Sequence, residues 1–95
     1  MARKVIWSPH AAQSLQDICS FIERDSKRYA SIFAQRIITA IEIAAEFPEM
    51  GRIVPEYKNP VLREKILGDY RIVYRLKDSI IEIAVIVHGA RLLRL

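Results

Sequence analysis

The stretch GDYRIVYRLKDSIIEIAVIVHGAR, Gly68 to Arg91, gives the clearest indication of the fold. It contains two runs rich in β-branched and aromatic residues, YRIVYRL and IIEIAVIV, separated only by KDS, which is typical of a β-hairpin. A third run of this kind, VLREKI, precedes it and is separated from it by LGD. We therefore expect three antiparallel strands in a meander, each followed directly by the next.

Upstream of these strands, the spacing of apolar residues changes to a helical period. The run KVIW (Lys4–Trp7) predicts a short first strand, which stops where Ser8 can cap a helix and Pro9 fits its first turn. Apolar residues then recur every three or four positions as far as about Arg24. This segment is expected to be an amphipathic helix with one apolar stripe.

A second helix follows almost immediately. Asp25 and Ser26 offer caps, and a second apolar stripe, which starts at Tyr29, continues to about Phe47, before Pro48. So short a connection predicts an antiparallel helical hairpin that lays its apolar faces on the sheet. The predicted fold is one α+β domain over residues 1–95: an N-terminal strand, a helical hairpin and a three-stranded antiparallel meander, or β-α-α-β-β-β.

Composition limits the classes of function. The 95 residues are 52% hydrophobic and 27% charged, as in an ordinary globular domain, and the net charge of +4 favours anionic partners. A single cysteine cannot form an internal disulfide, and we expect a cytoplasmic protein with no membrane partner. No metal-ligand spacing or glycine-rich phosphate loop is present, so no metal and no cofactor are expected.

The register of the strands predicts which side chains face outward. With a two-residue turn at Lys77 and Asp78, the large apolar residues of both strands, from Tyr70 to Val85, share the side that meets the helices. For the preceding hairpin we prefer a three-residue loop, Leu67 to Asp69, in which Gly68 or Asp69 is left-handed. Glu64 then falls among core positions and needs a partner such as Arg52.

In this register the outer face of the sheet is basic. One acid, Glu82, lies among the cations, and paired like charges on a sheet cost stability unless an anion binds there. His10 and Cys19 are interpreted as a surface residue and a small core residue. The predicted anion-binding or target-binding face comprises Arg63, Lys65, Arg71, Arg75, His88 and Arg91.

The chain resembles the ParE/RelE superfamily of toxins from type II toxin–antitoxin systems, which include plasmid stabilisation proteins. The resemblance lies in WSPHAAQSLQDICSFI, FPEMGRIVPE, LREKILGDYRIVYRL and VIVHGAR, and it covers almost the whole length. It implies the same β-α-α-β-β-β fold and a growth-arresting activity relieved by a cognate antitoxin. We expect that antitoxin to have an acidic C-terminal segment and to form a hetero-oligomer with the toxin.

The superfamily contains two activities, and the resemblance leaves both open. RelE-like members cleave mRNA on the ribosome, and a match to their sites implies Arg71 and Arg91, with His88 as the remaining acid/base on the face. The chain departs from that pattern, because ARLLRL contains neither a terminal tyrosine nor a histidine. ParE-like members block DNA gyrase by binding, so a ParE-like gyrase inhibitor, not an enzyme, is favoured. A RelE-like endoribonuclease or an inactive antitoxin-binding module remains the alternative.

Overall fold

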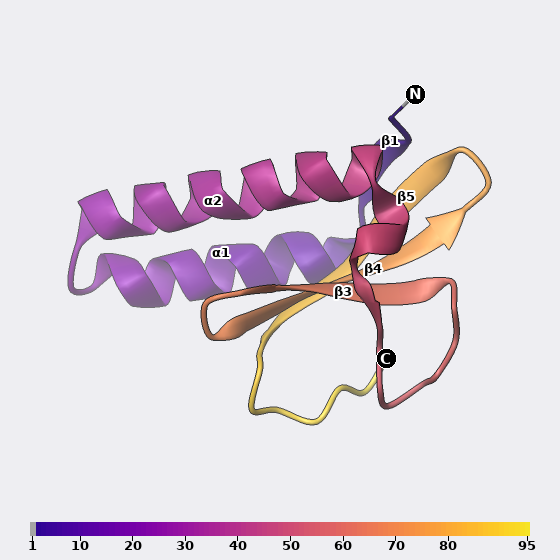
Figure 1. The fold of residues 1–95 in the computed structure, drawn as a ribbon. Coiled ribbons are helices and arrows are strands. Elements are labelled where there is room, and N and C mark those ends of the chain that lie inside the picture. Colours follow the sequence, from indigo (N-terminus) through magenta and orange to yellow (C-terminus); the bar gives the residue numbers. More distant parts are fainter. Residues whose placement is uncertain (1) are drawn as a thin grey trace.

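The computed structural model describes residues 2–95 and confirms the predicted order of elements. The elements are β1 (Lys4–Trp7), α1 (Pro9–Glu23), α2 (Lys27–Glu46), the 3-10 helix η1 (Pro48–Met50), β2 (Arg52–Ile53), β3 (Leu62–Leu67), β4 (Tyr70–Lys77) and β5 (Ile80–His88). The five strands form one sheet in the order β1-β5-β4-β3-β2, and α1 and α2 both lie on one side of it (Figure 1). No helix within residues 2–95 is long and apolar enough to cross a membrane.

Two strand pairings go beyond the predicted meander. β1 pairs in parallel with β5, with Lys4 opposite Ile80, so the first strand lies beside the last one. The two-residue strand β2, which the sequence did not predict, adds an antiparallel edge beside β3. The sheet is therefore mixed, with the meander at its centre and a short strand on either side.

Both helices begin at the predicted caps. The Ser8 hydroxyl accepts the amide of Ala11 at 3.0 Å, and the Ser26 hydroxyl accepts the amide of Tyr29 at the same distance. Ser8 also donates its hydroxyl to the carbonyl of Ala84 in β5 at 2.8 Å. One capping side chain thus ends the first strand, starts the first helix and ties that helix to the sheet.

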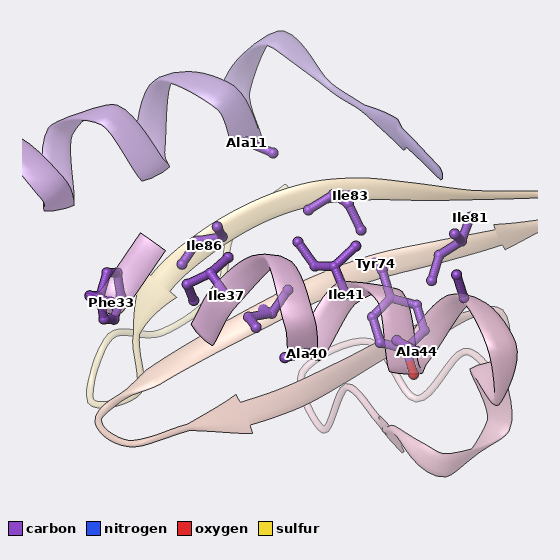
Figure 2. Packing of buried hydrophobic residues seen from close by; sticks show 12 residues of the cluster. Ala11, Phe33, Ile37, Ala40, Ile41, Ala44, Tyr74, Ile81, Ile83 and Ile86 are labelled. Carbon is purple, nitrogen blue, oxygen red and sulfur yellow. The ribbon is translucent and has the colours of Figure 1, made fainter. Parts of the chain in front are cut away.

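The larger core lies between the helices and the sheet (Figure 2). Ile37 of α2 is fully buried, and alanines beside it on α2 let the helix approach the strands closely. The hydroxyl of Tyr74 donates to the carbonyl of Pro48 at 2.7 Å, and burial raises its pKa. This helix-side core comprises Ala11, Phe33, Ile37, Ala40, Ile41, Ala44, Ala45, Ile72, Tyr74, Ile81, Ile83 and Ile86.

The strand registers differ from the predicted ones in both hairpins. Leu67 pairs with Tyr70, so the first turn has two residues and not the three that we preferred. Gly68 does adopt the left-handed conformation, with φ of 57°. In the second hairpin Lys77 pairs with Ile80, which moves the turn one residue along the chain. In the first hairpin the apolar alternation favoured the wrong turn, because the observed two-residue turn sets Lys65 opposite Ile72 and so interrupts the alternation on the helix side. In the second hairpin the alternation did not distinguish the two turns, because each keeps large apolar residues on the helix side.

A β-bulge in β5 reverses the predicted facing of the end of that strand. The register shifts between Val73 and Tyr74 of β4, and Ala84 is the extra residue of β5. Val85, expected against the helices, therefore belongs to a second, outer core, whereas Ile86 enters the helix-side core. The bulge is also the reason that the residues after it, including the predicted site residue at the end of β5, change sides.

The outer side of the sheet is covered and not open as predicted. A small apolar cluster lies there under the segment 54–60 and the C-terminal segment 91–95, which Figure 1 shows on the side away from the helices. Leu93 is only 5% exposed, whereas its neighbour Leu92 is 70% exposed. The outer core comprises Val54, Leu62, Val73, Ala84, Val85 and Leu93.

Candidate functional site

The predicted basic face does not exist as one surface. Arg71 and Arg75 do lie on the outer side of the sheet, but Arg63 and Lys65 pair with core-facing residues of β4 and so lie on the helix side. His88 also lies on the helix side, because of the bulge in β5. The prediction of a shared face is wrong, since a change of register by one residue moves a side chain to the opposite face of a sheet.

Arg71 is a buried structural ion and not a solvated cation. Its side chain is 5% exposed, and its Nη1 and Nη2 atoms each donate to one carboxylate oxygen of Glu56 at 2.7 Å. Its Nε donates to Oε1 of Glu64 at 2.6 Å, and Nη1 also donates to the carbonyl of Arg91 at 3.3 Å. This fork-to-fork geometry is the strong form of an arginine–carboxylate pair, and it occupies the donors that would otherwise hold a phosphate.

Two carboxylates neutralise this arginine from different elements. Glu64 of β3 is 1% exposed and also pairs with Arg52, the partner expected for it, although Glu64 faces the outer side of the sheet and not the helices. The Arg71 guanidinium and then the amide of Leu93 lower the pKa of Glu56 to about 2. The same pair raises the pKa of Arg71, because the ionised form of each partner stabilises the other.

The other cations of the predicted face have separate partners. Arg75 lies directly opposite Glu82 on the neighbouring strand and pairs with it at 3.0 Å, and both remain partly exposed. Arg63 donates to three backbone carbonyls, those of residues 49, 51 and 60, and so holds η1 and the end of the segment 54–60 against β3. Arg63 and Arg75 therefore support the fold locally, whereas Lys65 lies beside α2 at the rim of a groove.

A cleft of about 490 Å³ between α1 and the end of β5 brings together two predicted site residues and one that we had set aside. His88 and Arg91 line it from the end of β5, and His10 lines it from the first turn of α1. The ring of His88 lies edge-on to Tyr70, with centroids 5.7 Å apart. Phe21, 64% exposed, also lines the cleft. The arrangement combines hydrogen-bonding rings, a guanidinium and exposed aromatic surface, which suits recognition of another macromolecule.

A second, apolar groove of about 460 Å³ lies between α2 and β3. Ile32 and Ile43 contribute exposed apolar surface along α2, being 43% and 46% exposed, although Ile32 belongs to the apolar stripe that was predicted to pack on the sheet. Arg36 and Lys65 lie beside this apolar floor, and neither makes an ion pair within the described chain. An apolar floor rimmed by cations is complementary to an acidic amphipathic segment.

The remaining candidates do not form a reactive centre. Among residues 2–95, no group of three or more histidine, cysteine or acidic side chains is placed to hold a metal ion. Burial first, and then the negative charge of Glu23, raise the pKa of the Cys19 thiol. A raised pKa keeps the thiol protonated, so Cys19 is not an activated nucleophile.

Sequence reasoning missed two residues that organise these sites. Glu56 lies in an irregular segment, and its partner Arg71 is fifteen positions away, so neither helical nor strand spacing relates them. His10 has no local signal at all, because only the packing of α1 along β5 brings it toward His88. The one available signal was Glu64, whose position in an apolar alternation already required a buried cation nearby.

Comparisons with known proteins agree on the kind of protein. A family model, the ParE toxin of the type II toxin–antitoxin system parDE, matches residues 5–93. The toxin RelE2 of Caulobacter vibrioides is 34% identical over 90 residues, which cover 94% of this chain and 98% of that protein.

Two solved structures have the same fold. The chromosomal ParDE toxin–antitoxin system from P. aeruginosa superposes with a TM-score of 0.75 at 20% identity, covering 92% of this chain and 96% of that one. The RelBE2 toxin–antitoxin complex from Mycobacterium tuberculosis gives 0.64 at 18% identity, covering 93% and 99%. Because the family model matches residues 5–93, nearly the full length of this chain, the chain belongs to the ParE toxin family, within the ParE/RelE superfamily of type II toxin–antitoxin systems.

Proposed function

We propose that this toxin arrests growth by binding DNA gyrase and not by cleaving mRNA on the ribosome. The observation that supports this most directly is the state of Arg71, the arginine that the resemblance matches to a RelE-like site. Its donors are engaged by Glu56 and Glu64, so a phosphate would have to displace two carboxylates from it, of which Glu64 is fully buried. Removing one partner of such a network costs about 3–5 kcal/mol, which opposes use of Arg71 as a phosphate ligand.

The division of the RelE-like residue set between two sides of the sheet supports the same proposal. Cleavage of RNA by general acid–base chemistry requires the acid, the base and the phosphate-binding cation within hydrogen-bond reach of one phosphate. Arg71 lies in the outer network, whereas His88 and Arg91 line the cleft beside α1. A binding function has no such requirement, because a contact surface needs only complementarity.

We infer that the target contacts the cleft between α1 and β5. Exposed Phe21 offers an apolar anchor, and Arg91 and the two histidines offer polar contacts around it. Aromatic and arginine side chains grouped in one hollow are typical of the residues that dominate protein–protein binding energy. Of the six predicted site residues, His88 and Arg91 are therefore the two that we retain for target binding.

We further infer that a cognate antitoxin covers the groove between α2 and β3. Its apolar floor suits the buried anchors of a folding segment, and Arg36 and Lys65 suit acidic residues on either side. The solved relatives are described as toxin–antitoxin systems or complexes, which supports a hetero-oligomer for this toxin too. Charge would speed the encounter, and the apolar contacts would supply most of the lasting affinity.

The proposal predicts that the purified toxin inhibits gyrase supercoiling and leaves ribosome-bound mRNA intact. Replacement of Arg91 by alanine should weaken inhibition about tenfold or more, as for a central interface arginine. Replacement of Arg94, which is also exposed but does not line the cleft, should change it less than about twofold. Supercoiling assays with both variants, and with a cognate antitoxin added back, make this measurement.

Three other outcomes would contradict parts of the proposal. Cuts in translated mRNA with normal supercoiling would establish the RelE-like activity instead. Antitoxin binding without any growth arrest would identify an inactive antitoxin-binding module. Equal loss of inhibition in the Arg91 and Arg94 variants would remove the cleft from the target surface, because long-range charge and not a local contact would then explain binding.

A further inference from the structure

The C-terminal segment 91–95 has no helix or strand, yet it is anchored at defined points on the outer side of the sheet. Leu93 inserts into the outer core, whereas Leu92 and Leu95 are 70% and 49% exposed. One apolar anchor in five residues is too little burial to hold an irregular segment by itself, since each ordered residue costs about 1–2 kcal/mol of backbone entropy. The polar contacts of the segment therefore matter for its position.

Those contacts come from the segment 54–60. The amide of Leu93 donates to Oε2 of Glu56 at 2.9 Å, and the amide of Leu95 donates to the hydroxyl of Tyr57 at 2.7 Å. On the sheet side, the carbonyl of Arg91 accepts from Nη1 of Arg71 at 3.3 Å. Glu56 and Tyr57, which are adjacent in one loop, and Arg71 of β4 thus hold the C-terminal segment at three residues. Those residues are Arg91, Leu93 and Leu95.

Glu56 is the centre of this arrangement. Its Oε2 atom accepts from both Arg71 and Leu93, so one carboxylate joins the sheet to the C-terminal segment. Arg71 is itself held from the opposite direction by Glu64, which is fully buried. A carboxylate locked by a bidentate arginine cannot follow a moving segment, and it therefore defines where Leu93 can lie.

The position of Leu93 determines the direction of Arg91. Only one residue separates them, and the amide of Arg91 donates to the carbonyl of His88 at 3.0 Å, which closes a tight turn after β5. With both ends of the turn held, the side chain of Arg91 is directed to the cleft that it lines with His88 and His10. Without the anchor at Leu93, Arg91 would keep only the turn contact at its amide and the weaker bond from Arg71 at its carbonyl, and the segment beyond it would be held at Leu95 alone.

From these contacts we propose that Glu56 is a positioning residue: it fixes the C-terminal segment on the outer side of the sheet and thereby holds Arg91 at the cleft on the other side. The inference rests on the proposed role of the cleft in target binding. In this proposal the outer ion network does not contact the target itself, but it positions Arg91 in the cleft that does contact the target.

The test compares Glu56→Gln with the matched control Glu42→Gln, an exposed carboxylate of α2 that makes no ion pair within residues 2–95. In the full-length toxin, Glu56→Gln should speed amide exchange at Leu93 by about tenfold, the equivalent of one charged hydrogen bond. Exchange at Ile37 in the helix-side core should change much less. Unchanged protection of Leu93 in the Glu56→Gln variant would overturn the proposal, whatever the toxin binds.

A double-mutant cycle tests the link to the cleft. Glu56→Gln should reduce growth arrest on expression about as much as Arg91→Ala, and the double mutant should be no weaker than Arg91→Ala alone, because both changes remove the same contact. Additive losses would show that Glu56 acts independently of Arg91 and would refute the positioning role. If the wild-type toxin arrests growth without inhibiting gyrase, the gyrase assignment fails while this cycle remains valid.

A milder variant covers the case in which Glu56→Gln does not fold. Tyr57→Phe removes only the hydroxyl that accepts the amide of Leu95 and leaves the ion network intact. It should increase exchange at Leu95 by about three- to tenfold, the range of a neutral hydrogen bond, with little change at Leu93. Equal protection of Leu95 in both proteins would contradict the anchoring of Leu95 by Tyr57.

Discussion

The two sides of the sheet are built on different physical principles. On the helix side, two amphipathic helices cover an almost wholly apolar cluster in which Ile37, Ile81 and Ile83 are fully buried. On the outer side, irregular segments cover a smaller apolar cluster and two nearly buried ions, Arg71 and Glu64. The helix side obtains its stability from buried area, which is non-directional, whereas the outer side depends on hydrogen bonds that require one geometry.

This difference explains what each side can contribute to function. A buried ion network adds little net stability over an apolar core of the same shape, but it tolerates no missing partner. It therefore defines the positions of segments that have no regular structure, such as the C-terminal segment beside Leu93. The helix-side core gives the domain its free energy of unfolding, and the outer network places the residues that flank the cleft.

Removal of Arg71 is the strongest test of the difference between the two sides of the sheet. Arg71→Ala should lower the free energy of unfolding by about 3–5 kcal/mol, because Glu56 and Glu64 would lose their shared buried cation. Arg75→Ala, on the same face but with its side chain 38% exposed, should cost about 1 kcal/mol or less. Urea denaturation measures the free energy of unfolding of both variants. Equal losses would mean that removing a partner from the outer network costs no more than removing one from a surface ion pair.

Matched truncations compare the two apolar clusters. Ile37→Ala and Leu93→Ala remove the same number of carbons, but Ile37 is fully buried between packed helices and strands, whereas Leu93 lies in the smaller outer core under irregular segments and is 5% exposed. We expect losses of about 4 kcal/mol for Ile37→Ala and about 2 kcal/mol for Leu93→Ala. The exposed Leu92→Ala serves as the control, with a change of about 0.5 kcal/mol or less. A larger loss for Leu93→Ala would reverse the ranking of the two sides.

The pH dependence of stability gives a further test of the outer network. The pKa of Glu56 is about 2 in the folded toxin, whereas an unfolded glutamate titrates near pH 4.3, so the ionised group stabilises the fold above that pH. This stabilisation should disappear as the pH falls from about 5 toward 2. Glu56→Gln should therefore have a shallower loss of stability over that range than wild type, measured by denaturation at several pH values. Glu42→Gln should keep the wild-type slope, and identical slopes for all three proteins would contradict the pairing.

Local chemistry predicted the elements well. Ser8 and Ser26 cap the two helices as expected, and the period of the apolar residues located the strands of the meander to within a few residues. These signals are local, because a cap or an amphipathic stripe is satisfied within one or two turns of chain. The family resemblance, carried by motifs along the chain, was confirmed by the family model.

The register of the strands and the ion pairs between distant residues could not be predicted from the sequence. Two registers that differ by one turn residue both keep apolar side chains inward, and only the bulge at Ala84 decides that His88 faces α1 and not the outer side. The partnership of Arg71 with Glu56 likewise joins a strand to a loop with no periodic relation between them.

The caps, the helical hairpin, the meander and the net positive charge of the toxin could therefore be predicted from local sequence. Which cations are exposed could not, since exposure depends on the elements that the fold places over each face. Arg71 would be a solvated cation on an open sheet, and it becomes a structural ion because residues 54–60 and 91–95 lie over it. The covering of one strand by segments distant in sequence depends on the packing of the whole chain. The period of the apolar residues indicates only which residues share a face of one helix or strand.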